Sequence, residues 1–261
     1  MKVVEPVLKV EQLSKVFGGL TAVSRCQIEL YPGELVGLIG PNGAGKTTIF
    51  NLLTGVYPPT EGNIYFAGKN ITGSKPYQIT AMGMARTFQN IRLFADLTVL
   101  DNVKIACHWH GQYGLLSTIL RLPGFNAGEK IMTEKAEELL KIFRLDHKKN
   151  ELAKNLPYGE QRRLEIARAL AARPRLLLLD EPAAGMNPQE TRELMNLIRW
   201  VRNEFDLTIL LIEHDMSLVM GICERIYVLD YGKVIAHGTP EEIQNDPKVI
   251  EAYLGEEVKR A

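Results

Sequence analysis

The sequence has few cysteines and no long apolar run. Its three cysteines, Cys26, Cys107 and Cys223, lie far apart among 261 residues. Such a sparse, odd-numbered set excludes a disulfide framework and is typical of a reducing compartment. The longest apolar runs, such as Leu176–Leu179 and Leu207–Ile212, have the length of a strand and fall well short of the roughly 18 residues that suggest a membrane helix. The first ten residues lack an apolar signal core as well, so we expect no direct insertion into a membrane.

The sequence also lacks an excess of charge of either sign. Lys and Arg number 31 and Asp and Glu number 31, which gives a net charge of zero. Proteins that bind nucleic acid usually carry a basic excess, so we expect no nucleic-acid partner. A hydrophobic fraction of 46% and a charged fraction of 24% are typical of a folded globular chain and exclude a disordered one.

Short apolar runs alternate with stretches of helical period, which predicts an α/β fold. Residues 35–39, 176–179 and 207–212 are expected to form buried strands, and the chain after Lys46 is expected to form a helix that ends near Gly55. From about Asn90 to Asn155 the pattern is mainly helical. We interpret that stretch as a helical subdomain inserted into the α/β core.

The C-terminal part carries clear turn and cap signals. Arg225–Asp230 and Lys233–His237 flank Tyr231-Gly232, a pattern that favours a β-hairpin. Thr239 and the residues after it form a capping box, and a second short helix is expected to open at Asp246-Pro247 and close at Gly255. Simple capping of the core is the favoured interpretation of this segment, with regulation of a dimer as the alternative.

A phosphate-binding loop follows the first buried strand. The pattern G-x-x-x-x-G-K-[ST] is matched by Gly40, Pro41, Asn42, Gly43, Ala44, Gly45, Lys46 and Thr47. Its glycines allow backbone N–H groups to surround a phosphate, and the helix that follows adds the positive end of its dipole. We expect Lys46 to reach the β- and γ-phosphates and the Thr47 hydroxyl to bind Mg²⁺.

Two carboxylates follow the second buried strand, at Asp180 and Glu181. Ligands of α/β sheets bind at the carboxyl ends of the strands, where both side chains are expected. Asp180 is predicted to hold Mg²⁺, usually through water, and Glu181 to act as the general base toward the attacking water.

Further motifs make the likeness to one family specific. Four further segments resemble, in chain order, the Q-loop, the signature loop, the D-loop and the switch-histidine loop of this family. They are Thr87–Asn90, Leu156–Arg163, Ala184–Asn187 and Ile212–Met216. Together with Phe17 they resemble the ATP-binding-cassette ATPases over essentially the whole chain. The resemblance implies ATP and Mg²⁺ as cofactors and a head-to-tail dimer in which each ATP lies between two protomers.

The resemblance also implies roles for single residues. Phe17 would stack on adenine, Val23 and Thr48 would add nucleotide contacts, and Gln89 would sense the γ-phosphate and magnesium together with Thr47 and Asp180. His214 would act with Glu181 and Lys46 in catalysis. The signature residues expected to act on the partner's nucleotide are Pro157, Tyr158, Gly159 and Glu160.

Two signature positions depart from the family pattern. Pro157 stands where the family usually has Ser, and Glu160 stands where it usually has Gln, with Gln161 next in the chain. Pro157 offers no hydroxyl to a γ-phosphate. Our hypothesis is that backbone amides suffice at this position.

The family likeness fixes the expected architecture. A P-loop NTPase core with an N-terminal antiparallel β subdomain is expected at residues 1–89 and 161–238. A helical signature subdomain is expected at 90–160 and a C-terminal helical tail at 239–261.

Within the family, the chain most resembles the larger ATPase subunit of bacterial branched-chain amino acid uptake systems. The residues that carry this resemblance are Asn155–Leu170, Leu176–Pro188, Leu210–Ile222 and Val249–Glu256. It implies a second ATPase subunit in a heterodimer, two membrane permease subunits, indirectly a solute-binding protein, and a cytoplasmic location on the inner face of the membrane. The alternatives are the ATPase of lipopolysaccharide export and a soluble cassette ATPase such as one of iron–sulfur assembly.

Three shorter segments have their own interpretations. Cys107–His110 could suggest a metal site, but too few ligands lie nearby in sequence, and a partly buried helix is favoured. The apolar stripe of 111–128 could dock on membrane subunits, although packing within its own subdomain is favoured. Asn90–Phe94, directly after Gln89, is the better candidate for the surface that couples to the permease.

Overall fold

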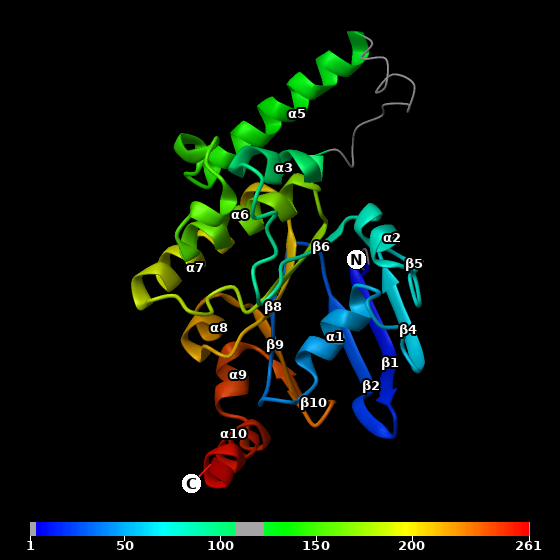
Figure 1. Cartoon of the computed structure of the whole chain (residues 1–261). Coiled ribbons are helices and arrows are strands. Elements are labelled where there is room, and N and C mark those ends of the chain that lie inside the picture. The colour runs from blue at the N-terminus through cyan, green and yellow to red at the C-terminus, as the bar shows by residue number, and fades with distance from the viewer. Residues whose placement is uncertain (1–3, 108–122, 261) are drawn as a thin grey trace. The chain divides into compact units, whose positions relative to one another are not determined.

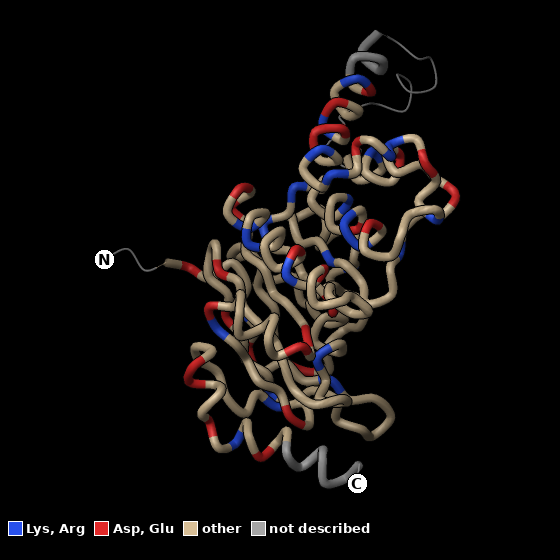
Figure 2. The backbone as a smooth tube through the Cα atoms, turned by 90° about the vertical axis from the view of Figure 1, so that its left-hand side faces the viewer, with Lys and Arg blue, Asp and Glu red and all other residues tan. Residues whose placement is uncertain are grey.

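The computed structural model describes residues 4–107 and 123–260, with 123–127 and 254–260 described by their backbone alone. The described chain divides into two compact units, one of residues 1–86 and 175–261 and the other of Thr87–Pro174. We describe each unit by itself. In both units acidic and basic residues are interspersed along the chain (Figure 2).

A six-stranded sheet forms the centre of the first unit, with the strand order β10-β9-β3-β8-β7-β6. All neighbouring strands pair in parallel except β9 and β10, which pair antiparallel as the predicted hairpin. The predicted buried strands at 35–39, 176–179 and 207–212 are confirmed as β3, β7 and β8, buried along their whole length. The strands are β3 (Leu35–Ile39), β6 (Met84–Arg86), β7 (Leu176–Asp180), β8 (Thr208–Ile212), β9 (Arg225–Asp230) and β10 (Lys233–Gly238).

A four-stranded antiparallel sheet with the order β2-β1-β4-β5 is the second layer of this unit (Figure 1). Its alternating pattern of buried and exposed residues is typical of a sheet with one covered face, and its inner residues join the same apolar core as those of β3 and α1. The predicted α/β fold with an antiparallel β subdomain is therefore confirmed. The strands are β1 (Leu8–Phe17), β2 (Leu20–Leu30), β4 (Glu61–Phe66) and β5 (Lys69–Asn70).

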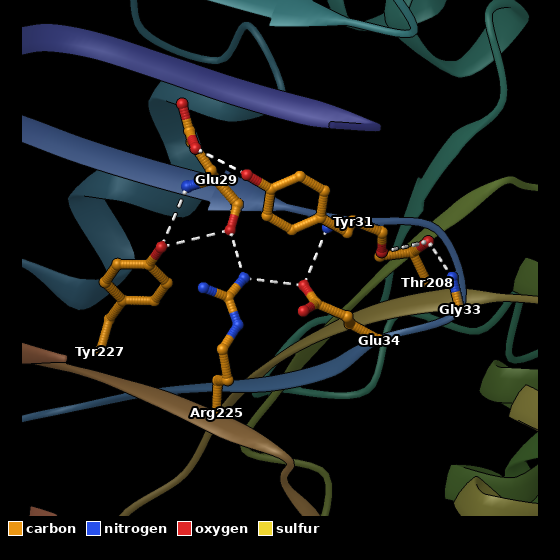
Figure 3. Close-up of polar contacts among 7 residues, drawn as sticks. All are labelled: Glu29, Tyr31, Gly33, Glu34, Thr208, Arg225 and Tyr227. Carbon is orange, nitrogen blue, oxygen red and sulfur yellow. Dashed lines mark hydrogen bonds and ion pairs between the residues drawn. The ribbon is translucent and has the colours of Figure 1, made fainter. Parts of the chain in front are cut away.

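A polar network joins the two sheets (Figure 3). Arg225 of β9 donates from Nη2 to the carbonyl of Glu29, at 2.8 Å, and to Oε2 of Glu34, at 2.7 Å. The Tyr227 hydroxyl accepts the backbone N–H of Glu29 at 3.1 Å, and the Arg225 guanidinium lies near the rings of Tyr31 and Tyr227. Charge-assisted hydrogen bonds of this kind fix the end of β2 against the beginning of β3 and β9.

The helices of the first unit are placed by local sequence signals. Helix α1 begins directly after the phosphate loop and ends before Gly55, as predicted. Helix α7 has Pro188 in its first turn and a capping box between Asn187 and Glu190, and it buries Leu194, Ile198 and Val201 on one face. The helices are α1 (Lys46–Leu53), α2 (Pro76–Ala81), α7 (Pro188–Glu204), α8 (Met216–Ile222), α9 (Pro240–Gln244) and α10 (Pro247–Arg260).

The expected end of the last helix is wrong. The predicted capping box at Thr239 is present and opens α9, but α10 continues through Gly255 to Arg260. Glycine costs only about 1 kcal/mol inside a helix, so it ends a helix only where the neighbouring residues favour a turn. Across the described ranges 4–107 and 123–260, no helix is both long enough and apolar enough to cross a membrane.

The second unit is helical. It consists of α3 (Val99–Cys107), α5 (Pro123–Ile142) and α6 (Tyr158–Ala171), with 3₁₀ turns at Asp146–Lys148 and Ala153–Asn155. Helix α6 buries Leu164, Ala167, Leu170 and Ala171 on one face. It lies wholly in this unit, whereas the sequence analysis assigns residues from 161 onward to the core.

Candidate nucleotide site

The phosphate loop joins β3 to α1 and lines a cleft of about 320 Å³ in the first unit. Two of its glycines are required by close approach of the backbone. A Cβ on Gly40 would lie 2.1 Å from the carbonyl oxygen of Leu229, and one on Gly45 would lie 2.6 Å from that of Ala22. Both glycines also have positive φ, 148° and 102°, which side chains disfavour. The loop is thus shaped by glycine where no other residue fits.

The Lys46 ammonium group lies against the loop that precedes it. Nζ donates to the carbonyl of Gly40 at 2.6 Å and to that of Pro41 at 2.9 Å, and the residue is 8% exposed. These carbonyls hold the cation over the loop, where backbone N–H groups and the N-terminus of α1 also favour an anion. The phosphate loop therefore presents a cation and N–H dipoles to an anion although the chain has no net charge.

Glu181 lies in the same cleft as the phosphate loop. Its backbone has φ 45°, a left-handed conformation that costs a non-glycine residue free energy and persists where the surrounding structure imposes it. The backbone N–H of Glu181 donates to the carbonyl of Ile212 at 2.9 Å. The end of β8 therefore helps to fix the conformation that turns the Glu181 side chain toward the phosphate loop.

His214 follows the neighbouring strand and faces the same carboxylate. Its Nδ1 lies 3.7 Å from Oε2 of Glu181 and 3.8 Å from Oε2 of Glu213. Sequence reasoning brings His214 and Glu181 together, and the structure does so as well. The His214 side chain is 64% exposed, so it is accessible to a ligand.

Glu213 is a buried acid that sequence reasoning does not single out. It is 1% exposed, accepts the backbone N–H of Ala183 at 2.8 Å and accepts that of His214 at 3.1 Å. Burial raises the pKa of Glu213, and these backbone N–H groups oppose the rise. The carboxylate ties the loop after β7 to the loop after β8.

Asp180 ends β7 and is also nearly buried, at 3% exposure. It forms an ion pair of 2.7 Å with Arg86. The hard oxygen donors of Asp180 and Thr47 are of the kind that Mg²⁺ prefers. Among the residues that the structure describes, no group of three or more His, Cys, Asp or Glu side chains could hold a metal by itself. A magnesium ion here would depend on the phosphates of a nucleotide for further ligands.

The cleft is lined partly by residues that the sequence analysis does not name, and the predicted Phe17 and Val23 are not among its lining residues. Phe17 is 40% exposed and meets Tyr57 edge-to-face, with ring centroids 5.3 Å apart. Val23 is fully buried, and its side chain lies close to Gly45 of the phosphate loop. The lining residues missing from the prediction are Leu20, Thr21, Ala22 and Tyr231.

Tyr231 reaches the cleft because the β9–β10 turn lies against the phosphate loop. The N–H of Gly232 donates to the carbonyl of Ala44 at 2.9 Å, and the N–H of Ser24 donates to the carbonyl of Gly232 at 2.8 Å. The sequence shows Tyr231 only as a turn residue. In the structure Tyr231 has a φ of 41°, and no sequence pattern predicts this conformation.

A second cavity of about 600 Å³ lies beside the phosphate loop. Pro41 and Asn42 line it together with Tyr231 and, from α10, Lys248 and Glu251. The C-terminal helix is thus close to the loop in the first unit.

Gln89 and the signature residues belong to the second unit, where the buried Arg162 joins them. Its guanidinium donates to the carbonyl of Phe88 at 2.6 Å and to that of Gln89 at 2.7 Å. Glu165 pairs with Arg162 at 2.8 Å and accepts the backbone N–H of Arg92 at 3.2 Å. Burial raises the pKa of Glu165 despite this pairing. Residues 88–92 are therefore held by the signature helix.

The two unusual signature residues have defined surroundings. Pro157 precedes the first turn of α6 and provides no side-chain cap, and Gly159 lies within that turn. Glu160 pairs with Lys148 at 2.7 Å. The Gln161 amide instead donates to the carbonyl of Leu156 at 2.8 Å, so its side chain is engaged within its own loop.

The family described as "ABC transporter" matches residues 23–184, more than half of the chain. The chain belongs to this family. A second family, described as "Branched-chain amino acid ATP-binding cassette transporter", matches residues 233–259. That range covers β10, α9 and most of α10 of the cassette.

Relatives and solved structures agree with this assignment. The cassette is 52% identical over 252 residues to the high-affinity branched-chain amino acid transport ATP-binding protein LivG of Escherichia coli (strain K12), covering 97% of this chain and 99% of the relative. It is 36% identical over 253 residues to the lipopolysaccharide export system ATP-binding protein LptB of Haemophilus influenzae, covering 97% and 99%. The ADP conformation of MJ1267, an ATP-binding cassette of an ABC transporter, superposes with a TM-score of 0.83 at 32% identity, covering 96% of this chain and 99% of that one. The cassette is accordingly a nucleotide-binding ATPase.

Two interpretations of single segments concern residues outside the described ranges. His108, Trp109 and His110 of the possible metal cluster lie there, as does most of the stretch 111–128.

Cys107 ends α3 and is buried, and Cys26, Cys107 and Cys223 are all free thiols, as the sparse cysteine content predicts.

Proposed function

We propose that this cassette is the ATP-hydrolysing subunit of an ABC importer for branched-chain amino acids. The observation that carries the proposal is the 52% identity to LivG over nearly the full length of both chains. The match of residues 233–259 to the branched-chain amino acid family supports it from a separate part of the sequence. The identity to LptB is lower, at 36%, and we therefore favour amino acid uptake over lipopolysaccharide export. The family match also favours a transport ATPase over a soluble cassette of iron–sulfur assembly.

The residues of the first unit would act in nucleotide binding and hydrolysis. The phosphate-loop amides and Lys46 bind the phosphates, while Phe17 stacks on the adenine. Glu181 accepts the proton of the attacking water, and His214 bridges Glu181 and the γ-phosphate. Thr47 and Asp180 would hold Mg²⁺, which neutralises phosphate charge when bound.

The proposed assembly is a head-to-tail heterodimer with a second ATPase subunit. The first turn of α6, at Pro157, Tyr158, Gly159 and Glu160, would contribute backbone N–H groups to the nucleotide held by the partner. ATP then closes the dimer, and hydrolysis reopens it. Two permease subunits would hold the dimer at the cytoplasmic face of the membrane, with a solute-binding protein as an indirect partner.

The proposed permease contact is Asn90–Phe94. Phe94 is 50% exposed, Arg92 is exposed as well, and the Arg92 guanidinium lies 4.2 Å from the ring centroid of Phe88. A cysteine introduced by Arg92→Cys should crosslink to a membrane subunit in the assembled transporter. A matched control is Arg202→Cys on α7. Equal adduct yields from both positions, or none from Arg92→Cys, would reject this surface.

The transport role has its own experiment. The tagged cassette should co-purify from native membranes with two permease subunits and a second ATPase, and branched-chain amino acids should stimulate its ATP hydrolysis when the solute-binding protein is present. Recovery in a soluble complex without permease subunits would contradict the proposal. Recovery with lipopolysaccharide-export subunits would replace amino acid uptake with that export.

A further inference from the structure

Arg86, the last residue of β6, forms a buried ion pair with Asp180. Nη2 of Arg86 lies 2.7 Å from Oδ2 of Asp180, and the two side chains are 7% and 4% exposed. The sequence analysis assigns no role to Arg86. A carboxylate this deeply buried is costly without a partner, and removal of one member of such a pair leaves the other uncompensated.

The same guanidinium also contacts the helix that follows the phosphate loop. Nη1 of Arg86 donates to Oδ1 of Asn51 at 2.7 Å and lies 3.4 Å from Oγ1 of Thr54. The guanidinium lies over the Phe50 ring at 5.4 Å from its centroid. Asn51 and Phe50 belong to α1, which begins at Lys46 and Thr47. Arg86 therefore joins the helix that carries Thr47 to the strand that carries Asp180.

We propose that Arg86 is a positioning residue that sets the affinity of the nucleotide site for Mg²⁺. It fixes the Asp180 carboxylate before metal binds and, as its counter-cation, weakens the attraction of that carboxylate for a divalent cation. This inference rests on the proposed role of Asp180 in holding Mg²⁺. The physical reason is that a paired carboxylate has a local charge near zero, whereas an unpaired one is a full negative charge in a medium of low polarity.

Two consequences distinguish this role from a merely structural one. Neutral replacement of Arg86 destabilises the nucleotide-free chain, because the buried Asp180 carboxylate loses its ion pair with Arg86. The same replacement strengthens Mg²⁺ binding, because the positive charge of Arg86 no longer offsets the negative charge of the Asp180 carboxylate. A structural residue would lower stability equally with and without metal.

The experiment uses the purified full-length chain and fluorescent AMP-PNP, which avoids any dependence on hydrolysis. The variants are Arg86→Met and Arg86→Gln, which both remove the charge, and Arg86→Lys, which keeps it. For each we would measure the Mg²⁺ concentration that gives half-maximal nucleotide binding, and the Tm with nucleotide plus EDTA and with nucleotide plus Mg²⁺. We expect half-maximal nucleotide binding by the neutral variants at a Mg²⁺ concentration at least about threefold lower than that of the unsubstituted chain. We also expect Mg²⁺ to raise the Tm of these variants by more than it raises that of the unsubstituted chain. Arg86→Lys should remain near the unsubstituted value.

A Mg²⁺ requirement that is unchanged or higher in both neutral variants would overturn the proposal, as would an equal loss of Tm with and without Mg²⁺. If Arg86→Met fails to fold, Arg86→Gln retains a hydrogen-bonding group of similar length and decides the result. Asp180→Asn distinguishes the proposed metal role of Asp180 from the proposed role of Arg86. An unchanged Mg²⁺ requirement in Asp180→Asn would reject the metal role of Asp180 and this inference with it. A weaker Mg²⁺ response in Asp180→Asn, with no change in the neutral Arg86 variants, would reject the role of Arg86 alone.

Discussion

Glu213 accepts the backbone N–H of Ala183 at 2.8 Å. The bond links the loop that follows Glu181 to the loop that carries His214, because the other oxygen of Glu213 accepts the N–H of His214 itself. The carboxylate thus positions two neighbouring groups of the proposed catalytic site from beneath without facing the cleft.

Replacement of this carboxylate should impair hydrolysis more than nucleotide binding. In Glu213→Ala, the two buried N–H groups lose their acceptor, at a cost of about 1–3 kcal/mol each in the folded state. We expect a lower kcat with a nearly unchanged Kd for ATP, since the phosphate loop is untouched. Steady-state kinetics and equilibrium binding test this, with Glu193→Ala on the exposed face of α7 as a control. A loss of ATP affinity as large as the loss of kcat would contradict the positioning role.

The raised pKa of Glu213 should also appear in the pH dependence of stability. Burial raises this pKa above its ordinary value of 4.5, so the folded chain binds the proton more tightly than the unfolded chain. The resulting stabilisation is present below pH 4.5 and is lost as the pH rises through the folded-state pKa. Relative to the unsubstituted chain, Glu213→Gln should therefore gain stability as the pH increases. Urea unfolding at a series of pH values measures the difference, and parallel stability curves would refute it.

Pro157 provides a test of the signature loop. We expect Pro157→Ser to change ATP turnover and ATP-driven dimerisation by less than about tenfold, because backbone N–H groups of the first turn of α6 are proposed to contact the partner's nucleotide without help from a hydroxyl. A rise of tenfold or more would show that the missing hydroxyl limits this subunit. The assay needs the partner ATPase, since the signature loop is proposed to serve the partner's nucleotide.

The three cysteines should be unreactive in the folded chain. Burial raises the pKa of both Cys26 and Cys223 to about 12, and it raises the pKa of Cys107 as well. The reactive thiolate is therefore scarce near neutral pH. A thiol reagent should label the native chain slowly and all three cysteines rapidly in guanidinium. Rapid labelling of the native chain would show that the buried thiols become exposed.

Local signals in the sequence predict much of the fold and of the site. The phosphate loop depends on glycines within eight consecutive residues, and β7 depends on an apolar run that ends in Asp180-Glu181. Both signals are short in sequence, so composition and spacing reveal them. The β9–β10 hairpin is found for the same reason, from Tyr231-Gly232 between two apolar segments.

The features that the sequence does not reveal depend on long-range pairing. Tyr231 meets the phosphate loop because β9 pairs with β3. Ala22 lies beside the loop because β2 contacts the β9–β10 turn through the Ser24–Gly232 hydrogen bond, and no local pattern encodes either contact. Arg86 is an unremarkable residue in sequence until β6 pairs with β7 and brings it to Asp180. At Gly255 the local signal predicts the end of a helix, but α10 continues through this residue to Arg260.

The most direct test of the account is ATP hydrolysis by Glu181→Gln, measured together with nucleotide occupancy in the assembled transporter. Glutamine keeps the size of the side chain but cannot accept the proton of the attacking water. We predict that hydrolysis falls by about a hundredfold or more, while ATP stays bound and the dimer remains closed. If Glu181→Gln hydrolyses ATP at the rate of the unsubstituted transporter and releases ADP, the assignment of Glu181 as the base is contradicted.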